Sequence, residues 1–527
     1  MGLIESIKDL FRKGGAKVGM VKTLVHITDD ERIHVPQREY DRIVRAKHYY
    51  ADDFPKVKYK NSYGNLCERQ LSSINMTKQV ARRLASLIFN EQCNVAANQE
   101  DDAAHMLIDN VLKASNFYTN YEERLERGIS TGGMAIMPYV EDDQIKLSWI
   151  NAEQFYPLQS NTTEIKEAAI ADQTTVQEGK KTWFYTMLEF HEWQKDEDGA
   201  KVYHIKHELY KSDKVNEVGM QVPLGSLEKY ANLQEEATIN EMTTPLFAYF
   251  KTPGDNNITP ESPLGLGVVD NAANTIDAIN LTHDQFVHEI KMGKRRIAVP
   301  SEMLRPGVRF DNKEIDLSHP QMFDKDVDVY EAMYGQNDLK ITDLTSSIRN
   351  DQYQASMQFF LNELESEIGL SAGTFTTDGQ GVKTATEIVS ENSKTYQTRS
   401  SYLTQVEEQL TTLVRAILYT AKSGDLFSDG KPRWTGDVDD VEITIDFNDG
   451  VFVDQEAQFN KDMQMVTGSM MPRYMFLVRN LGIDEDKAKQ LIAESDAETK
   501  EPDALIENSM FGGDGNANTA EHQVTGG

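Results

Sequence analysis

The sequence predicts an α+β fold that is predominantly helical. Segments of alternating polar and apolar residues concentrate between residues 134 and 250, as in strands with one buried face. After residue 262, apolar residues recur every three or four positions over long stretches, as in helices. The chain has 527 residues and 39% hydrophobic content, which is enough for roughly two to four packed units.

Charge and cysteine content narrow the classes of function. Lysine and arginine total 54 against 85 aspartates and glutamates, which gives a formal net charge of -31. This charge excludes a globally basic nucleic-acid binder but leaves room for local basic patches. Cys67 and Cys93 lack the spacing of a zinc site or a disulfide framework, which favours a reducing compartment. No apolar run approaches the ~18 residues of a membrane span, so we expect no membrane partner.

The first part of the chain, up to residue 262, is predicted to form one α+β domain. Residues 15–62 are mixed in character and predict an irregular lead-in. Helical spacing then predicts helices over residues 76–95 and 101–128. Five alternating segments predict strands, namely MAIMPYV, QIKLSWI, WFYTMLEFHEW, KVYHIKHELY and LFAYF.

Helices dominate the second part. Apolar spacing predicts a helix over residues 268–292, a turn-rich β-like insert follows, and a second helix is closed by Gly369 and Gly373. After the segment SAGTFTTDGQGVKTATE, the stretch from Thr384 to Ser423 contains no proline or glycine. It predicts one very long helix of about 38 residues.

The end of the chain returns briefly to β structure. The segment VEITIDF predicts a strand, and PRYMFLVRNLGIDEDKAKQLIAE predicts two helices divided by Gly482 and Asp484. Residues 511–527 lack apolar anchors, so we expect a disordered tail.

The glycine-studded segment SAGTFTTDGQGVKTATE raises the question of a phosphate-binding loop. A Walker A motif needs GxxxxGK followed by serine or threonine, so that backbone amides wrap the phosphates and the lysine reaches them. Here Val382 separates Gly381 from Lys383, and the preceding segment is predicted to be a helix rather than a strand. A nucleotide site is therefore disfavoured.

Other signatures of chemistry are incomplete. HIKHEL lacks the order of HExxH, DFNDGVFVDQE places its glycine one position early for a calcium loop, and no GxSxG occurs. The sequence therefore indicates no catalytic residue, no metal ligand and no cofactor.

The order of the predicted elements is unusual. Two helices flank a small β insert, and a glycine-rich loop connects them to a helix that is too long for the core of one domain to cover. Neighbouring copies of the chain could cover it.

This plan, together with three segments, resembles the portal proteins of tailed bacteriophages, especially those of siphophages of Gram-positive hosts. The segments are WINAEQFYPL, SPLGLGVVDNAANTIDAIN and GLSAGTFTTDGQGVKTATEIVSENSKTYQTRSSYLTQVEEQL, of which the last is the most specific. The resemblance covers nearly the full chain. It implies a phage portal fold, with wing, stem, clip and crown, that assembles into a homo-oligomeric ring of about twelve subunits.

The resemblance also implies a division of the chain. Its parts are the wing (1–262), the first stem helix (263–292), the clip (293–345), the second stem helix (346–370), the tunnel loop (371–383), the long helix with the return to the wing (384–454), the crown (455–510) and the disordered tail (511–527).

The function implied by the resemblance is that of a non-enzymatic portal vertex protein. Its ring would form the channel through which double-stranded DNA enters during packaging and leaves during ejection. It would nucleate the procapsid with scaffold and major capsid protein, and dock the terminase large subunit and later a head-tail connector or adaptor. Its place would be the portal vertex of the capsid in the virion, after synthesis in the host bacterial cytoplasm.

Two groups of residues are candidates for contact with DNA. A tunnel loop must change conformation as a duplex passes, and glycines supply a permissive backbone. The candidates in the loop are Thr374, Thr376, Thr377, Gly379, Gln380, Gly381 and Lys383. The second group is a basic belt at the first stem helix and clip, comprising Lys291, Lys294, Arg295, Arg296, Arg305 and Arg309. An interpretation in which these cations complement the macrodipole at a helix carboxyl end is as good as one in which they contact DNA or a neighbouring subunit.

Two other classes of protein stay open on the sequence alone. A nucleic-acid motor or nuclease would require a complete phosphate loop or clustered carboxylates. Another capsid or head-completion protein would assemble as a lattice rather than a closed ring, and gives no reason for this order of helices, insert and loop.

Overall fold

The computed structural model describes most of the chain between residues 22 and 495. The described ranges are 22–60, 64–90, 93–98, 103–158, 164–196, 199–293, 297–300, 310–311, 314–315, 330–333, 342–343, 345, 347–376, 393–447, 455–468, 471–481, 483 and 487–495. The chain divides into two units, Met1–Asn448 and Asp449–Gly527.

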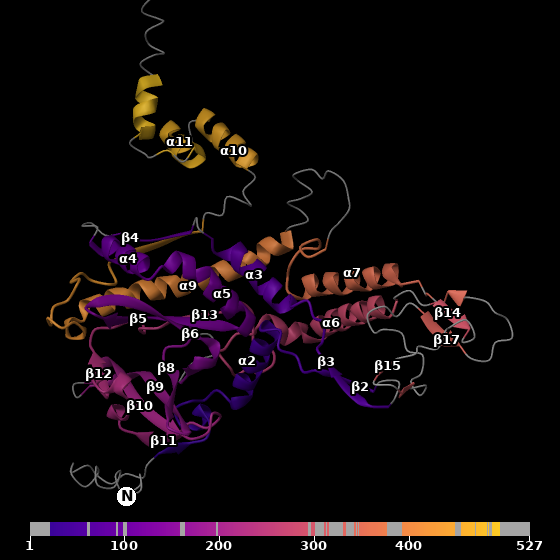
Figure 1. The fold of residues 1–527 in the computed structure, drawn as a ribbon. Coiled ribbons are helices and arrows are strands. Elements are labelled where there is room, and N and C mark those ends of the chain that lie inside the picture. The colour runs from indigo at the N-terminus through magenta and orange to yellow at the C-terminus, as the bar shows by residue number, and fades with distance from the viewer. Residues whose placement is uncertain are drawn as a thin grey trace, which may run out of the picture. The chain divides into compact units, whose positions relative to one another are not determined.

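A seven-stranded antiparallel sheet forms one layer of the first unit (Figure 1). Its strands follow the order β1-β11-β10-β9-β8-β7, and β12 pairs with β10 beside β11. The longest ladder joins β9 to β10, from Lys195 opposite Lys201 to Phe184 opposite Ser212. The strands are β1 (Thr23–Leu24), β7 (Phe155–Pro157), β8 (Ala168–Glu178), β9 (Lys181–Lys195), β10 (Lys201–Ser212), β11 (Gly219–Val222) and β12 (Glu236–Ile239).

A second, three-stranded sheet lies next to helices in the same unit, in the order β13-β5-β6. The long helix α9 contacts β5 and β13 (Figure 1). These strands are β5 (Gly133–Glu141), β6 (Gln144–Asn151) and β13 (Ala248–Lys251), and the helices around them are α2 (Gln37–Tyr50), α3 (Met76–Ile88), α4 (Ala103–Ala114), α5 (Phe117–Thr131) and α9 (Ser393–Lys422). Two two-stranded ladders complete this region, β4 (Cys93–Asn98) with β19 (Glu442–Phe447), and β2 (Val57–Lys60) with β3 (Leu66–Arg69).

The main core of the first unit lies between the large sheet and α2. Leu188 and Phe190 of β9 are fully buried there with Tyr40 and Ile43 of α2 and Phe155 of β7. Burying side chains of this size contributes about 1.5–3 kcal/mol each. This core fixes α2 against the sheet, and α2 in turn contacts the start of α6.

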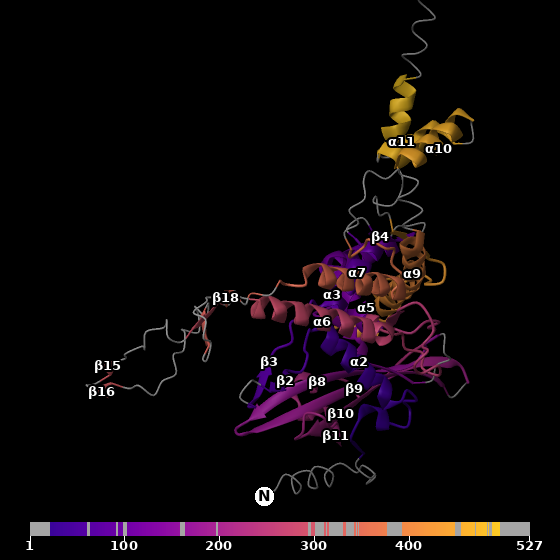
Figure 2. The same cartoon turned by 90° about the vertical axis from the view of Figure 1, so that its right-hand side faces the viewer.

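Two antiparallel helices leave this body side by side, as both views show (Figures 1 and 2). They are α6 (Val268–Met292) and α7 (Asn350–Glu367). Between them the structure describes short strands only, with β14 paired parallel to β17 and antiparallel to β18, and β15 paired to β16. These strands are β14 (Ile297–Pro300), β15 (Phe310–Asp311), β16 (Glu314–Ile315), β17 (Tyr330–Met333) and β18 (Thr342–Asp343).

The second unit contains α10 (Gln455–Thr467) and α11 (Arg473–Leu481), followed by a helical stretch over residues 487–495. Asp462 of α10 is fully buried and accepts a hydrogen bond from the Asn480 amide at 3.0 Å. The two helices predicted from PRYMFLVRNLGIDEDKAKQLIAE are present as α11 and the helical stretch over residues 487–495. The predicted divider, Gly482 and Asp484, lies outside the described residues.

The five predicted strands and the helix over residues 268–292 are confirmed. The predicted closure of α7 is also confirmed, since Gly369 has a φ of 76° directly after the helix. For the long helix, the structure describes Ser393–Lys422, and the predicted start at Thr384 lies outside the described residues. As predicted, the fold combines helices with sheets.

Three local predictions are wrong. Residues 15–62 were expected to be irregular, but residues 37–50 form α2. The helix predicted over 76–95 ends at Ile88 and gives way to β4. The helix predicted over 101–128 is two helices, because Asn116 adopts a left-handed conformation with φ of 47° between α4 and α5. Such a residue interrupts the ladder of helical hydrogen bonds.

Candidate functional site

The candidate site consists of the α6/α7 pair and the turn that joins α7 to α9. Its root is a buried ionic network between α2 and the start of α6. Arg42, with 4% of its side chain exposed, bonds Asp270 of α6 and the Gly265 carbonyl at 2.9 Å. Asp270 also accepts the Gly267 amide at 2.7 Å, which satisfies one of the free N–H groups at the amino end of α6. The direction of α6 is thereby tied to α2.

Glu39 completes this network. Its carboxylate accepts hydrogen bonds from the Thr259 hydroxyl at 2.7 Å and the Asn256 amide at 2.9 Å, and lies 3.2 Å from Arg42. Burial opposes ionisation of Glu39, but the bond from Thr259 and the charge of Arg42 outweigh it and hold the pKa below the ordinary value. Glu39 is therefore a buried carboxylate whose ionised form is stabilised by its partners.

A second link ties α6 to the ribbon of β2 and β3. Arg69 of β3 makes two hydrogen bonds to Asp284 of α6, at 2.5 and 2.6 Å. Asp284 also accepts the Ser72 amide at 3.0 Å, and the Ser72 carbonyl lies 2.9 Å from Nδ1 of His283. The Arg69 guanidinium lowers the pKa of Asp284. The middle of α6 is thus held on the side that faces β3.

At the far end of the pair, α6 and α7 are joined by an exposed ion pair. Arg349 donates to both carboxylate oxygens of Glu289, with a shortest distance of 2.7 Å, and its backbone amide donates at 2.9 Å. These bonds lower the pKa of Glu289 to about 2. Tyr353 stacks at an angle on Phe286, with ring centroids 5.0 Å apart. The two ends of the intervening segment are therefore adjacent.

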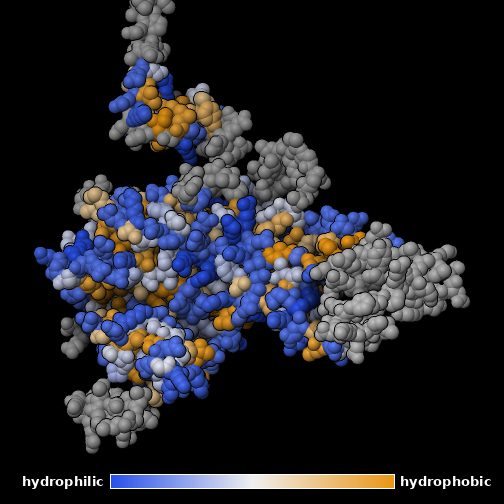
Figure 3. All heavy atoms as spheres, in the orientation of Figure 1, coloured by the Kyte–Doolittle hydropathy of each residue, from blue (hydrophilic) through white to orange (hydrophobic). Residues whose placement is uncertain are grey.

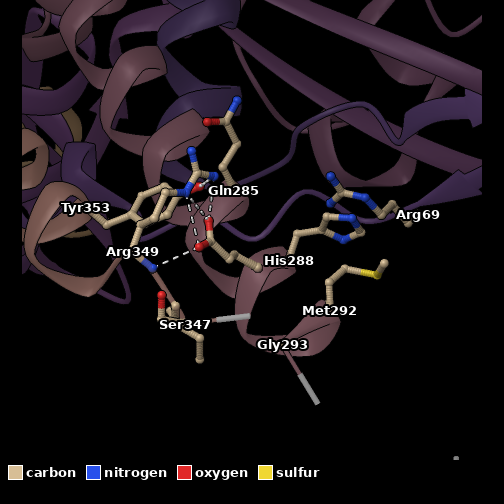
Figure 4. Close-up of a pocket in the computed structure, with 10 residues that line it drawn as sticks. Arg69, Gln285, His288, Met292, Gly293, Ser347, Arg349 and Tyr353 are labelled. Carbon is tan, nitrogen blue, oxygen red and sulfur yellow. Dashed lines mark hydrogen bonds and ion pairs between the residues drawn. The ribbon is translucent and has the colours of Figure 1, made fainter. Parts of the chain in front are cut away.

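An open pocket of about 710 Å³ lies at this end (Figure 4). Its polar lining includes Arg69, His288 and Arg349, but Arg69 and Arg349 are already paired with Asp284 and Glu289. A Cβ added at Gly293 would lie 3.0 Å from Cγ1 of Ile348. The pocket is thus a gap around the ends of two helices, and its charged groups are committed to the protein.

At the opposite end of α7 the chain turns toward α9. The Gly369 and Leu370 amides donate to the Ser366 and Glu365 carbonyls at 3.4 and 2.8 Å, which is a Schellman closure. The Glu365 side chain, 1% exposed, accepts the amides of Gly373 at 3.2 Å and Phe375 at 2.6 Å. A buried carboxylate thus holds the first turn of the segment after α7.

Hydrogen bonds also connect this turn to α9. Ser371 and Thr395 bond each other reciprocally: the Ser371 amide donates to Oγ1 of Thr395 at 2.9 Å, and the Thr395 amide donates to Oγ of Ser371 at 3.2 Å. The Thr398 hydroxyl donates to the Gly369 carbonyl at 2.6 Å. The end of α7 and the described start of α9 are therefore connected side chain to backbone.

The structure places only part of the predicted loop candidates. The Thr374 hydroxyl donates to the Ser371 carbonyl at 2.7 Å, so Thr374 is engaged within the turn, and Thr376 is buried at 7% exposure. The other loop candidates lie outside the described residues, namely Thr377, Gly379, Gln380, Gly381 and Lys383.

The same holds for the basic belt. Lys291 is exposed in the last turn of α6, where a cation complements the helix dipole. The remaining belt candidates lie outside the described residues, namely Lys294, Arg295, Arg296, Arg305 and Arg309.

Sequence reasoning missed Glu365, Thr395 and Arg349. A glutamate inside a helix ordinarily lies in solvent, and the sequence carries no signal that the amides of Gly373 and Phe375 return to it. The sequence carries a weak signal for Arg349: a cation just before a helix can form an ion pair with an acidic residue near the end of the preceding antiparallel helix.

Apolar side chains gather on the surface over α6 and α7 (Figure 3). Leu281 and Met292 of α6 are 54% and 50% exposed, and Phe359 of α7 is 63% exposed. Within the described ranges, no group of three or more His, Cys, Asp or Glu side chains is placed to hold a metal ion. None of the described helices combines the length and apolar character needed to cross a membrane.

Comparison with known proteins defines the class. A family model described as "Phage portal protein, SPP1 Gp6-like" matches residues 29–502. The chain therefore belongs to the phage portal proteins, in the SPP1 Gp6-like family. No curated protein matches it. A chain of the solved structure titled "Neck of empty GTA particle computed with C6 symmetry" is similar over 85% of this chain and 94% of that chain, with 9% identity and a TM-score of 0.40.

Family membership confirms the resemblance seen in the sequence. Portal proteins are structural components of phage heads, so the chain is not an enzyme, and the motor or nuclease hypothesis is set aside. Membership implies a role at the portal vertex of the capsid as an oligomeric ring.

Proposed function

We propose that about twelve copies of the chain form a closed ring whose central channel carries double-stranded DNA into the head during packaging and out during ejection. The observation that carries the proposal is the family match over residues 29–502, which includes both helices of the α6/α7 pair and the turn to α9.

In this proposal the parts of the chain take separate tasks. Residues 1–262 and 384–454 form the wing, and α6 and α7 are the stem. Residues 293–345 form the clip, residues 371–383 the tunnel loop and residues 455–510 the crown. Exposed Leu281, Met292 and Phe359 on the stem support an arrangement in which neighbouring subunits cover them.

The charge of the chain suits a conduit. With -31 per chain, a ring of about twelve copies carries roughly -370, so its wall repels the phosphate backbone. Weak contacts let a duplex slide. Loop candidates from Thr377 to Lys383 and the basic belt from Lys291 to Arg309 would supply the few attractive contacts.

The partners follow from the same proposal. Scaffold and major capsid protein surround the ring as it nucleates the procapsid. The clip docks the terminase large subunit during packaging and a head-tail connector afterwards. ATP hydrolysis belongs to the terminase.

The first test is the solution mass of the purified chain by light scattering, together with negative-stain images. Closed rings of about twelve chains with a central hole are expected. Extended sheets or lattices in place of rings would overturn the proposal. A second test supplies the chain to particles that lack their portal protein, where DNA-filled heads are expected.

A further inference from the structure

The turn that follows α7 is held by side-chain hydrogen bonds to both α7 and α9. Three buried polar residues lie in this region: Glu365, Ser371 and Thr395 are 1%, 4% and 7% exposed. A buried polar group is costly unless its hydrogen bonds are made. Here these hydrogen bonds are made: Glu365 of α7 bonds the segment after the helix, and Ser371 of that segment bonds Thr395 of α9.

Glu365 makes the central contact. Its two oxygens accept the amides of Gly373 and Phe375, one each, at 3.2 and 2.6 Å. Gly373 has a φ of 92°, a conformation that L side chains rarely adopt, so the backbone turns sharply to bring both amides to one carboxylate. A carboxylate forms stronger hydrogen bonds with backbone amides than a neutral acceptor does. The course of residues 371–376 is therefore set by a side chain of α7.

The second half of the arrangement reaches α9. Ser371 and Thr395 exchange two backbone-to-hydroxyl bonds, and their hydroxyl oxygens lie 3.0 Å apart. Lys394 donates to the carbonyl and hydroxyl oxygens of Ser366, both at 3.1 Å. A Cβ added at Gly369 would lie 2.4 Å from Oγ1 of Thr398, so α7 and α9 approach closely here.

We propose that Glu365, Ser371 and Thr395 form a clamp that fixes residues 371–376, the start of the segment after α7, and ties them to both α7 and α9. Glu365 is its positioning residue. Thr374 and Thr376 lie within residues 371–376, so contact with DNA falls to residues beyond them. The clamp itself does not depend on the proposed function. Only its effect on the passage of DNA rests on that proposal.

The clamp is tested first by amide hydrogen exchange in the purified full-length chain. Glu365→Gln keeps the shape of the side chain but replaces one acceptor oxygen by a donor, and Thr395→Val removes the hydroxyl without changing the branching. Glu363→Ala, an exposed glutamate of the same helix, is the matched control. We expect at least about tenfold faster exchange at Gly373 and Phe375 in Glu365→Gln, faster exchange at Ser371 in Thr395→Val, and wild-type exchange in Glu363→Ala. Unchanged exchange in both clamp variants would overturn the clamp.

The functional step is tested by supplying each variant to particles that lack their portal protein. Rings of normal mass with fewer DNA-filled heads are expected for Glu365→Gln and Thr395→Val, and a normal yield for Glu363→Ala. Faster exchange with a normal yield of filled heads would overturn the positioning role of Glu365 and leave the channel function standing. If the wild-type chain itself gives no filled heads, the proposed function fails, while the exchange data still decide the clamp.

Discussion

At the scale of residues, the molecule depends on a few buried charges. Arg42 lies between Glu39 and Asp270, and its guanidinium also reaches the Gly265 carbonyl. Burying charges costs several kcal/mol per ion, and the cost is recovered only while every partner is present. Removing one member leaves a buried charge without its partner, which destabilises the fold more than replacing the whole network by apolar residues would.

Arg42→Ala is therefore expected to lower the free energy of unfolding by about 3–5 kcal/mol, because the carboxylates of Glu39 and Asp270 stay buried without their cation. Denaturant unfolding of the purified chain measures this. Arg45→Ala is the control: half of the Arg45 side chain is exposed and its contact with Asp270 is 3.4 Å long, so about 1 kcal/mol or less is expected. Equal losses in both variants would contradict the role of burial.

The lowered pKa of Glu39 predicts that the stability of the fold depends on pH. The folded pKa of Glu39 lies below the ordinary value of 4.5, so its contribution is fully present above pH 4.5 and is lost as the pH falls through the folded pKa. Glu39→Gln should therefore destabilise the chain at pH 7, and the difference from wild type should shrink progressively below pH 4.5. Thermal unfolding midpoints of both proteins between pH 7 and pH 3 measure this. A difference that grows on acidification would contradict the assignment.

At the scale of elements, the sequence predicts helices well where one face is apolar. Val269, Ile276 and Ile279 are buried at helical spacing, so α6 could be predicted over its whole length. Helix α2 could not, because its buried face contains Glu39 and Arg42, whose charges hide the apolar period. The clamp at Glu365 was equally invisible, since its partners are backbone amides and any sequence supplies those.

Close backbone contacts between elements give a further prediction. A Cβ at Gly265 would lie 2.3 Å from both the Gly132 carbonyl oxygen and Oγ1 of Thr252. Gly265→Ala should therefore push the segment before α6 away from the α5–β5 turn and destabilise the chain by about 1–3 kcal/mol. Gly225→Ala is the control, because nothing lies within 4 Å of an added Cβ there, and a change of about 0.5 kcal/mol or less is expected. Chemical denaturation of the two variants decides between them.

At the level of the assembled chains, the net charge opposes association. Each chain carries -31, so subunits in a ring repel one another, and apolar contacts must overcome the repulsion. Exposed Leu281, Met292 and Phe359 on α6 and α7 are suited to that task. Salt should shift the balance, because it screens charge and leaves apolar contacts in place.

Raising the ionic strength from about 0.01 M to 0.15 M shortens the screening length from roughly 30 to 8 Å. The fraction of chains in rings, measured by light scattering at a fixed chain concentration, is expected to rise over this range. Rings that dissociate as salt is added would show instead that opposite charges hold the subunits together. Phe359→Ser should lower the ring fraction at every salt concentration, while Gln358→Ser, its exposed neighbour on α7, should not.

The ion pair between Glu289 and Arg349 has a consequence for how such a chain can diversify. It brings together the two points where α6 ends and α7 begins, and a Cβ added at Gly293 beside it would lie 3.0 Å from Cγ1 of Ile348. A segment whose two ends are already held together can be lengthened, shortened or exchanged at little entropic cost to the helices beneath it. We therefore expect that the segment between residues 293 and 348 can be exchanged for one of a different length while α6 and α7 keep their pairing.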